Sequence, residues 1–144
     1  TIINIEKQIN LNSYGNEDLS HITADFKDEL LKVPYVAIPK MIEEVHFSDK
    51  KPENKNILLP NKKDNLIKVY QENKWIYKDK KTTITNLMEN NYNIIDEHFE
   101  ENEDVPKHIE NQYNNFRQLY KSNDKTLQND IKVDCELVLL NNRN

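Results

Sequence analysis

Residues 66–78, LIKVYQENKWIYK, decide the fold class of this chain. Two runs rich in β-branched and aromatic residues, 66–70 and 74–78, flank the polar residues 71–73, and this pattern predicts two strands joined by a turn. The run 57–59, which ends at Pro60, predicts a third strand. We therefore expect a small three-stranded antiparallel meander. Because apolar residues recur at helical spacing on both sides of it, the predicted fold class is α+β.

Two helices are predicted before the meander. The first is expected to open at Asp18 and to end at Pro34, because apolar residues recur every three or four positions between them. The second is short, with Pro39 near its first turn, where the missing N–H of proline is tolerated.

Three helices are predicted after the meander. The first carries the apolar stripe from Ile84 to Phe99, and the second starts afresh after Pro106. Residues 122–124 are suitable to cap the third helix, which would run into the C-terminal tail. Residues 132–140 also alternate with period two, so a strand remains the alternative to the preferred helix there.

The N-terminal residues 1–12 alternate between apolar and polar, which predicts a strand with one apolar face. No hairpin partner is near, so this strand could pair with the later strands or with the same segment of another copy. We assign residues 1–15 to an N-terminal strand or linker with a possible role in oligomerisation, and residues 16–144 to a single α+β domain. The oligomerisation candidates are Ile3, Ile5, Ile9 and Leu11.

Charge is sorted along the chain. Residues 50–81 have a net charge of +6, whereas residues 1–49 have −5 and residues 82–144 have −6. This arrangement predicts a positive face suited to an anionic partner. Lysines neutralise phosphates and exposed aromatic rings stack on bases. The candidate nucleic-acid-binding residues are Lys50, Lys51, Lys55, Lys62, Lys63, Lys68, Lys74, Trp75, Lys78, Lys80 and Lys81.

The competing interpretation of the basic segment is compositional. The chain contains 22 Asn, 18 Lys and 15 Ile, residues that share A/T-rich codons, so an AT-rich genome would supply lysines without a functional reason. The segment has no Arg for bidentate contact with guanine, which disfavours sequence-specific recognition.

Most catalytic classes find little support in the sequence. Gly15 is the only glycine, too few for a phosphate-binding loop, and no nucleophile elbow is present. The single cysteine, Cys135, excludes a disulfide within the chain and indicates a reducing compartment. A His-Asn-His nuclease using His46 and the loop 52–56 is a lesser hypothesis. Such a site needs a histidine on a strand, whereas His46 is predicted to end a helix. We expect no enzyme activity, no cofactor and no metal site.

No membrane association is expected, because no apolar run approaches the roughly 18 residues that span a bilayer. The N-terminus has no basic region followed by an apolar run, so we expect no signal peptide.

Three stretches carry a family resemblance: YGNEDLSHIT (14–23), IPKMIEEVHF (38–47) and KPENKNI (51–57). With Lys74-Trp75 and the closing helices, they resemble the C-terminal domain of uncharacterised giant-virus (mimivirus-like) proteins, in which a two-Cys-two-His zinc finger often precedes this domain. The resemblance runs from about residue 3 to the end. The single cysteine cannot build the finger. Ala37 stands where Ser or Thr is common, which puts the start of that helix in doubt.

The resemblance implies DNA-associated work in the host cytoplasm (viral factory) or the virion. The leading hypothesis is a non-enzymatic viral accessory domain of DNA-binding machinery, which makes weak phosphate contacts through the Lys-rich sheet. It would self-associate through residues 1–12 and the C-terminal helices. The alternatives are a virion or assembly structural protein and, second, a metal-dependent nuclease. The expected partners are nucleic acid and further copies of the chain.

Overall fold

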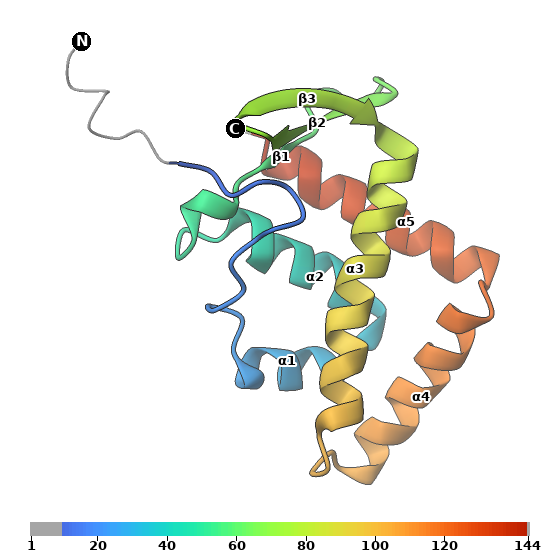
Figure 1. Cartoon of the computed structure of the whole chain (residues 1–144). Coiled ribbons are helices and arrows are strands. Elements are labelled where there is room, and N and C mark those ends of the chain that lie inside the picture. Colours follow the sequence, from blue (N-terminus) through green and yellow to red (C-terminus); the bar gives the residue numbers. More distant parts are fainter. Residues whose placement is uncertain (1–9, 144) are drawn as a thin grey trace.

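The computed structural model describes residues 10–143 and confirms the α+β fold class (Figure 1). Within that range, five α-helices pack with a three-stranded antiparallel sheet that has the strand order β1-β2-β3. The elements are α1 (Ala24–Leu31), α2 (Pro34–Phe47), a 3-10 helix η2 (Pro52–Asn54), β1 (Ile57–Leu58), β2 (Leu66–Gln71), β3 (Lys74–Asp79), α3 (Lys80–Glu101), α4 (Lys107–Lys121) and α5 (Lys125–Asn141).

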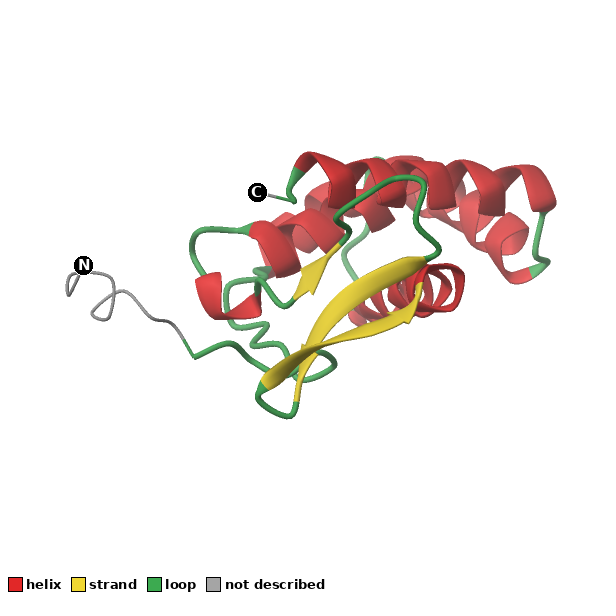
Figure 2. Ribbon diagram, turned by 90° about the horizontal axis from the view of Figure 1, so that it is seen from above, coloured by secondary structure: helices red, strands yellow, loops and turns green. Residues whose placement is uncertain are grey.

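The β2–β3 hairpin forms as the sequence predicts, and it lies along one side of the helices (Figure 2). Gln71 pairs with Lys74, so the loop contains only Glu72 and Asn73, with φ angles of 52° and 67°. Two positive φ angles are the mark of a type I′ turn, whose twist matches that of the two strands. Ile67 and Val69 are fully buried beneath the hairpin.

Helix α2 is the centre of the core. It packs against α1, α3 and α5, and its residues Ile38, Met41 and Ile42 are almost completely buried. Helix α3 runs from the sheet towards the end of the molecule where α1 and α4 lie (Figure 1). The sheet therefore occupies one end of the helical core.

The predicted start of the first helix is wrong. Helix α1 begins at Ala24, because the Thr23 side chain accepts a hydrogen bond from the N–H of Phe26 and caps the helix. The Asp18 carboxylate instead accepts from the N–H of Ser20 in a turn.

The predicted boundary between the first two helices is also wrong. Pro34 does not end α1, which stops at Leu31; it is the first residue of α2. Proline suits that position because the first N–H groups of a helix have no intrahelical partner. Pro39 therefore lies inside α2, beyond its first turn, and Ala37 is a buried residue rather than a cap.

The three C-terminal helices agree with the sequence pattern. Helix α5 begins as expected, with the Asp124 carboxylate accepting from the N–H of Leu127 at 3.0 Å. The tail 132–140 belongs to this helix, and its strand alternative is excluded. Helix α3 follows β3 without a loop, since Asp79 is both the last residue of the strand and the helix cap.

The predicted N-terminal strand falls mostly outside the described residues, and Ile3, Ile5 and Ile9 lie there. Leu11 is half-buried, and residues 10–12 have no regular secondary structure. The next residues join the domain: Asn12 N–H donates to Glu53 O and Tyr14 N–H to Tyr70 O, both at 2.7 Å. The predicted N-terminal segment, residues 1–15, is therefore hydrogen-bonded to the domain at Asn12 and Tyr14.

None of the helices in residues 10–143 combines the length and the apolar character that crossing a bilayer requires.

Candidate nucleic-acid interface

The outward side of the β2–β3 hairpin carries exposed aromatic and basic side chains. Alternation turns Ile67 and Val69 inwards and leaves the opposite parity outside. The register pairs Lys68 with Tyr77 and Tyr70 with Trp75 on that outer side. We call this surface the hairpin face; it consists of Leu66, Lys68, Tyr70, Trp75 and Tyr77.

The aromatic rings of the hairpin face contact one another and remain accessible. Trp75 is 41% exposed and Tyr77 is 62% exposed. Tyr70 meets Trp75 edge to face, with 5.7 Å between the ring centroids. The Lys68 ammonium lies 5.0 Å from the centroid of the Tyr77 ring, a cation–π contact. Flat π-surfaces with a cation beside them are what a stacking site for unpaired bases requires.

Further lysines lie at the β3–α3 end of the hairpin. Lys62 and Lys63 belong to the loop before β2, and the Lys80 ammonium donates to Lys62 O at 2.9 Å, which holds this loop against the start of α3. Lys80 also pairs with Glu136 at 3.2 Å. Within residues 10–143 no ion pair engages the remaining lysines of this end, which are Lys62, Lys63, Lys78 and Lys81.

The hypothesis of a Lys-rich sheet is wrong for Lys80 and Lys81, which do not lie in the sheet. They form the first turn of α3, because the Asp79 carboxylate accepts the N–H of Thr82 at 2.9 Å and starts the helix there. This hydrogen bond lowers the pKa of Asp79. Cations are unfavourable near a helix N-terminus, where the helix dipole is positive. Helix stability therefore does not explain the presence of Lys81.

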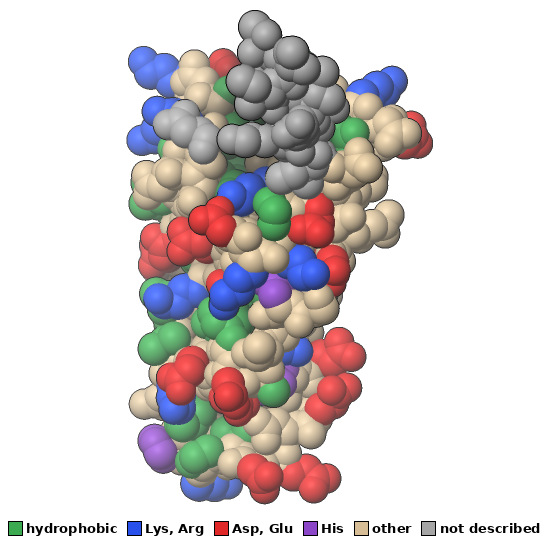
Figure 3. Space-filling model, turned by 90° about the vertical axis from the view of Figure 1, so that its left-hand side faces the viewer, with side chains coloured by type: hydrophobic (Ala, Val, Ile, Leu, Met, Phe, Trp, Pro, Cys, Tyr) green, Lys and Arg blue, Asp and Glu red, His purple; other side chains and the backbone are tan. Residues whose placement is uncertain are grey.

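The lysines before β1 form a separate group and are partly neutralised. Lys51 pairs with Asp18 at 3.0 Å and Lys55 with Asp49 at 2.6 Å, while Lys50 is exposed in the same loop. Hydrogen bonds from Ser20 and then the Lys51 partner lower the pKa of Asp18 to about 2. Figure 3 shows acidic and basic side chains intermixed on the side of the molecule that it presents. The predicted set of lysines thus divides into two groups. The lysines before β1 are partly neutralised, whereas Lys68 lies beside the Tyr77 ring and Lys62, Lys63, Lys78 and Lys81 at the β3–α3 end have no ion pair among the described residues.

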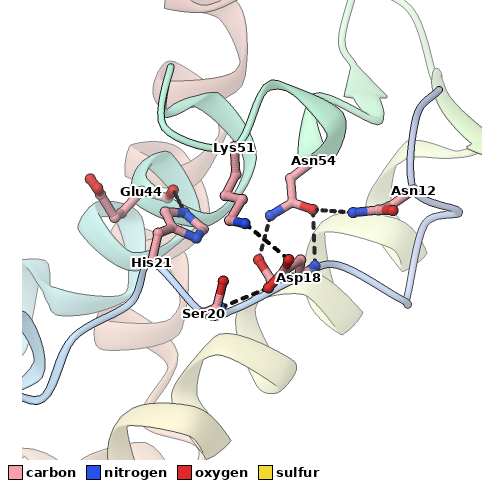
Figure 4. Close-up of polar contacts among 7 residues, drawn as sticks. All are labelled: Asn12, Asp18, Ser20, His21, Glu44, Lys51 and Asn54. Carbon is pink, nitrogen blue, oxygen red and sulfur yellow. Dashed lines mark hydrogen bonds and ion pairs between the residues drawn. The ribbon is translucent and has the colours of Figure 1, made fainter. Parts of the chain in front are cut away.

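A polar cluster beside the loop that carries Lys50, Lys51 and Lys55 holds residues 12–21 in place (Figure 4). The side chain of Asn54 is fully buried; it accepts from the N–H of Asp18 and donates to the Asp18 carbonyl. Asn54 also accepts from the Asn12 amide at 2.9 Å. His21 donates from Nε2 to Glu44 O at 2.7 Å. These contacts satisfy partly buried backbone groups, which is a structural role.

His46, the residue named in the nuclease hypothesis, is buried at the end of α2. Its Nδ1 lies 2.9 Å from Asn56 Oδ1 and 3.3 Å from Asn54 O. Burial lowers the pKa of the imidazole, which favours its neutral form. In the part of the chain that the structure describes, no group of three or more His, Cys, Asp or Glu side chains is placed to hold a metal ion.

Tyr70 and Tyr77 join Trp75 on the hairpin face, although only Trp75 was singled out as a binding residue. The signal was present in the sequence, because Lys68, Tyr70 and Leu66 share one parity of their strand and Trp75 and Tyr77 share one parity of theirs. The alternation of residues in the two strands does not by itself decide which of the two sets faces the core.

Comparison with known proteins identifies no relative of this chain: no family model, no curated protein and no solved structure matches it.

Proposed function

We propose that this chain is a non-enzymatic accessory domain of DNA-associated machinery that contacts unpaired nucleic acid through the hairpin face. The observation that carries the proposal is the exposure of Trp75 and Tyr77 on one strand face beside Lys68. Successive bases of a single strand would stack on the rings, and the free lysines at the β3–α3 end would neutralise phosphates.

Single-stranded rather than duplex nucleic acid fits this surface best. Bases within a duplex are already stacked and cannot present a face to Trp75 or Tyr77. Recognition is expected to be tolerant of sequence, because stacking does not distinguish bases strongly and the basic segment has no arginine for guanine. Binding should weaken steeply with salt, since lysine–phosphate contacts release counterions.

The experiment uses the intrinsic fluorescence of the protein, because Trp75 is the only tryptophan. Titration with oligo(dT) at low salt should quench its emission, and duplex DNA of equal length should do so far less. Trp75→Ala should weaken binding of labelled oligo(dT), measured by anisotropy, by about fivefold or more, in line with stacking energies of about 1–3 kcal/mol per base.

Matched charge reversals separate a specific surface from general electrostatics. The test variant changes Lys62, Lys63 and Lys81 to Glu. The control variant makes the same change at three lysines that are exposed on α4 and α5, namely Lys107, Lys121 and Lys125. Helix α4 and the start of α5, which carry the control lysines, lie away from the hairpin (Figure 1). We expect the first variant to lose oligo(dT) binding and the second to retain most of it. Equal losses in both variants, or unchanged Trp75 emission, would contradict the proposal.

A second candidate, an assembly role, is favoured by apolar side chains on the outside of two helices. Val133 and Leu137 on α5 are 49% and 47% exposed, and Leu137 lines a groove of about 320 Å³ together with Val36 and Pro39 of α2. Light scattering after size exclusion tests it: this candidate predicts a stable oligomer that Leu137→Glu dissociates. A monomeric wild-type protein that binds oligo(dT) would exclude it.

A further inference from the structure

A cavity of about 340 Å³ lies between the N-terminal segment, the end of α2 and the middle of α3. Its volume is near the lower end of the roughly 300–1,000 Å³ that small-molecule sites occupy. Polar side chains converge on it from all three elements: Tyr14 and Glu17 from the segment, His46 from α2 and Asn91 from α3. It does not include any residue of the hairpin face.

Asn91, which lines this cavity, has a buried polar atom without a partner among the described residues. The residue is only 3% exposed, and its Nδ2 donates to the Leu87 carbonyl at 2.8 Å. That bond fixes the orientation of the amide, because the opposite orientation would set two oxygens against each other. Within residues 10–143, Asn91 Oδ1 then has no hydrogen-bond partner, and neither has the buried hydroxyl of Tyr14. An unpaired buried acceptor costs free energy that an occupant of the cavity would recover.

His46 also presents an acceptor. Asn56 Nδ2 donates to the Glu17 carboxylate at 2.7 Å and to Asn12 O at 3.1 Å, so Asn56 Oδ1 is the atom that faces the histidine. Because His46 Nδ1 lies against this oxygen and the Asn54 carbonyl, Nδ1 carries the hydrogen and Nε2 carries the lone pair.

Glu17 adds a negative charge to the same cavity. In the described residues its side-chain hydrogen bonds, from Gly15 N–H and from Asn56, all end on Oε2, which leaves Oε1 able to accept. The cavity therefore gathers a carboxylate oxygen, an amide oxygen and an imidazole lone pair, together with a tyrosine hydroxyl. Three of these four groups only accept, so the complementary ligand is a donor.

We propose that this cavity binds a small primary amine as its ammonium form. The ammonium would be held by Glu17, Asn91 Oδ1 and His46 Nε2, and the apolar body would lie against Leu87 and Ile94, which line the same cavity. An ammonium offers three donors and a positive charge, which matches the acceptors and the carboxylate. The inference is independent of the proposed function of the hairpin face.

The test compares probes that match in shape and differ in the head group: phenethylamine, 2-phenylethanol and phenylacetate, with hexylamine and agmatine as further amines. Binding is followed by two-dimensional amide NMR of the full chain. We expect at least one amine to shift the resonances of Glu17 and Asn91 and to bind about tenfold or more tightly than the alcohol, with no binding of the carboxylate.

Variants connect the binding to the named residues. Glu17→Gln and Asn91→Ala should each weaken amine binding about tenfold or more, while Asn86→Ala, an exposed change on α3, should leave it unaltered. If one of the first two variants does not fold by circular dichroism, the other decides. The proposal is overturned if all three amines fail to bind, which would mean that the cavity holds only water. It is also overturned if the amine and alcohol bind alike, or if Glu17→Gln and Asn91→Ala bind as the wild type does.

Discussion

A single buried histidine gives this fold a pH dependence that can be measured. Burial lowers the pKa of His46 from its ordinary value of 6.5. The unfolded chain therefore binds the proton more tightly than the folded protein, so stability present above about pH 6.5 is lost as the pH falls towards the folded pKa. We expect the free energy of unfolding, measured by urea titration, to decrease from about pH 7 to about pH 5.

Two histidine variants test the origin of this decrease. His46→Gln should flatten the dependence, because glutamine does not titrate. His108→Gln is the control, since His108 is exposed in the first turn of α4. A His46→Gln protein with the full wild-type slope would refute the assignment.

Cys135 is expected to be chemically inert in the folded protein. The residue is completely buried in α5, and burial raises the pKa of its thiol to about 12. Since the thiolate is the reactive form, Ellman's reagent should label native protein slowly and label one thiol per chain after unfolding. Leu137→Cys, two residues along and half exposed, should react at once in a Cys135→Ser background. Equal rates at the two positions would contradict this expectation.

The helix caps show what single residues could and could not reveal in the sequence. Residues 122–124 were identified as the capping region of α5, which contains the actual cap Asp124, because a cap depends on neighbours within one turn. Asp18 and Thr23 are both suitable caps, and the choice between them depends on Asn54, which binds the backbone of Asp18 from 36 positions away. A local pattern contains no information about that distant amide.

At the scale of elements, the β2–β3 turn stores strain that two substitutions should relieve. Glu72 and Asn73 both adopt positive φ, which is costly for glutamate in particular. Replacing them with Asn-Gly, the preferred type I′ pair, should raise the free energy of unfolding by about 1 kcal/mol. Glu72→Gln keeps the strain while removing the charge, so it should leave stability nearly unchanged in urea titrations. A gain of equal size in Glu72→Gln would indicate a charge effect instead.

The meander was predictable because its strands are consecutive and its turn is two residues long, so every determinant lies within residues 57–79. The border between α1 and α2 was not, because Pro34 suits the position after a helix as well as the first position of one. Burial of Ala37 and Pro39 against the core, a tertiary effect, decides in favour of a helix that begins at Pro34.

At the scale of the whole molecule, Asn54 joins segments that are far apart in the sequence. Asn54→Ala would leave the backbone N–H and C=O of Asp18 without their partners, and the expected loss of stability is about 2–3 kcal/mol. Hydrogen exchange at the Asp18 amide should accelerate more than exchange in α4. Asn111→Ala, an exposed change on α4, should alter neither quantity. Unchanged exchange at Asp18 in Asn54→Ala would show that this amide does not hold the segment.

The order of charges along the chain does not carry over directly to the surface. Lys51 of the basic segment pairs with Asp18 from the acidic N-terminal part, and Lys80 pairs with Glu136 from the acidic C-terminal part. Folding brings these partners together across 33 and 56 positions, so no window along the sequence could show which lysines stay free. The exposed aromatic residues, which follow strand parity, were the better guide to the candidate interface.

Because β3 continues into α3 through the shared residue Asp79, no loop separates the hairpin from the helix. Bending at this junction would break the bond from Thr82 N–H to the Asp79 carboxylate. At 1.5 Å per residue, the 22 residues of α3 extend about 33 Å. A force applied to the hairpin would therefore be transmitted along α3 to the loop that joins α3 to α4.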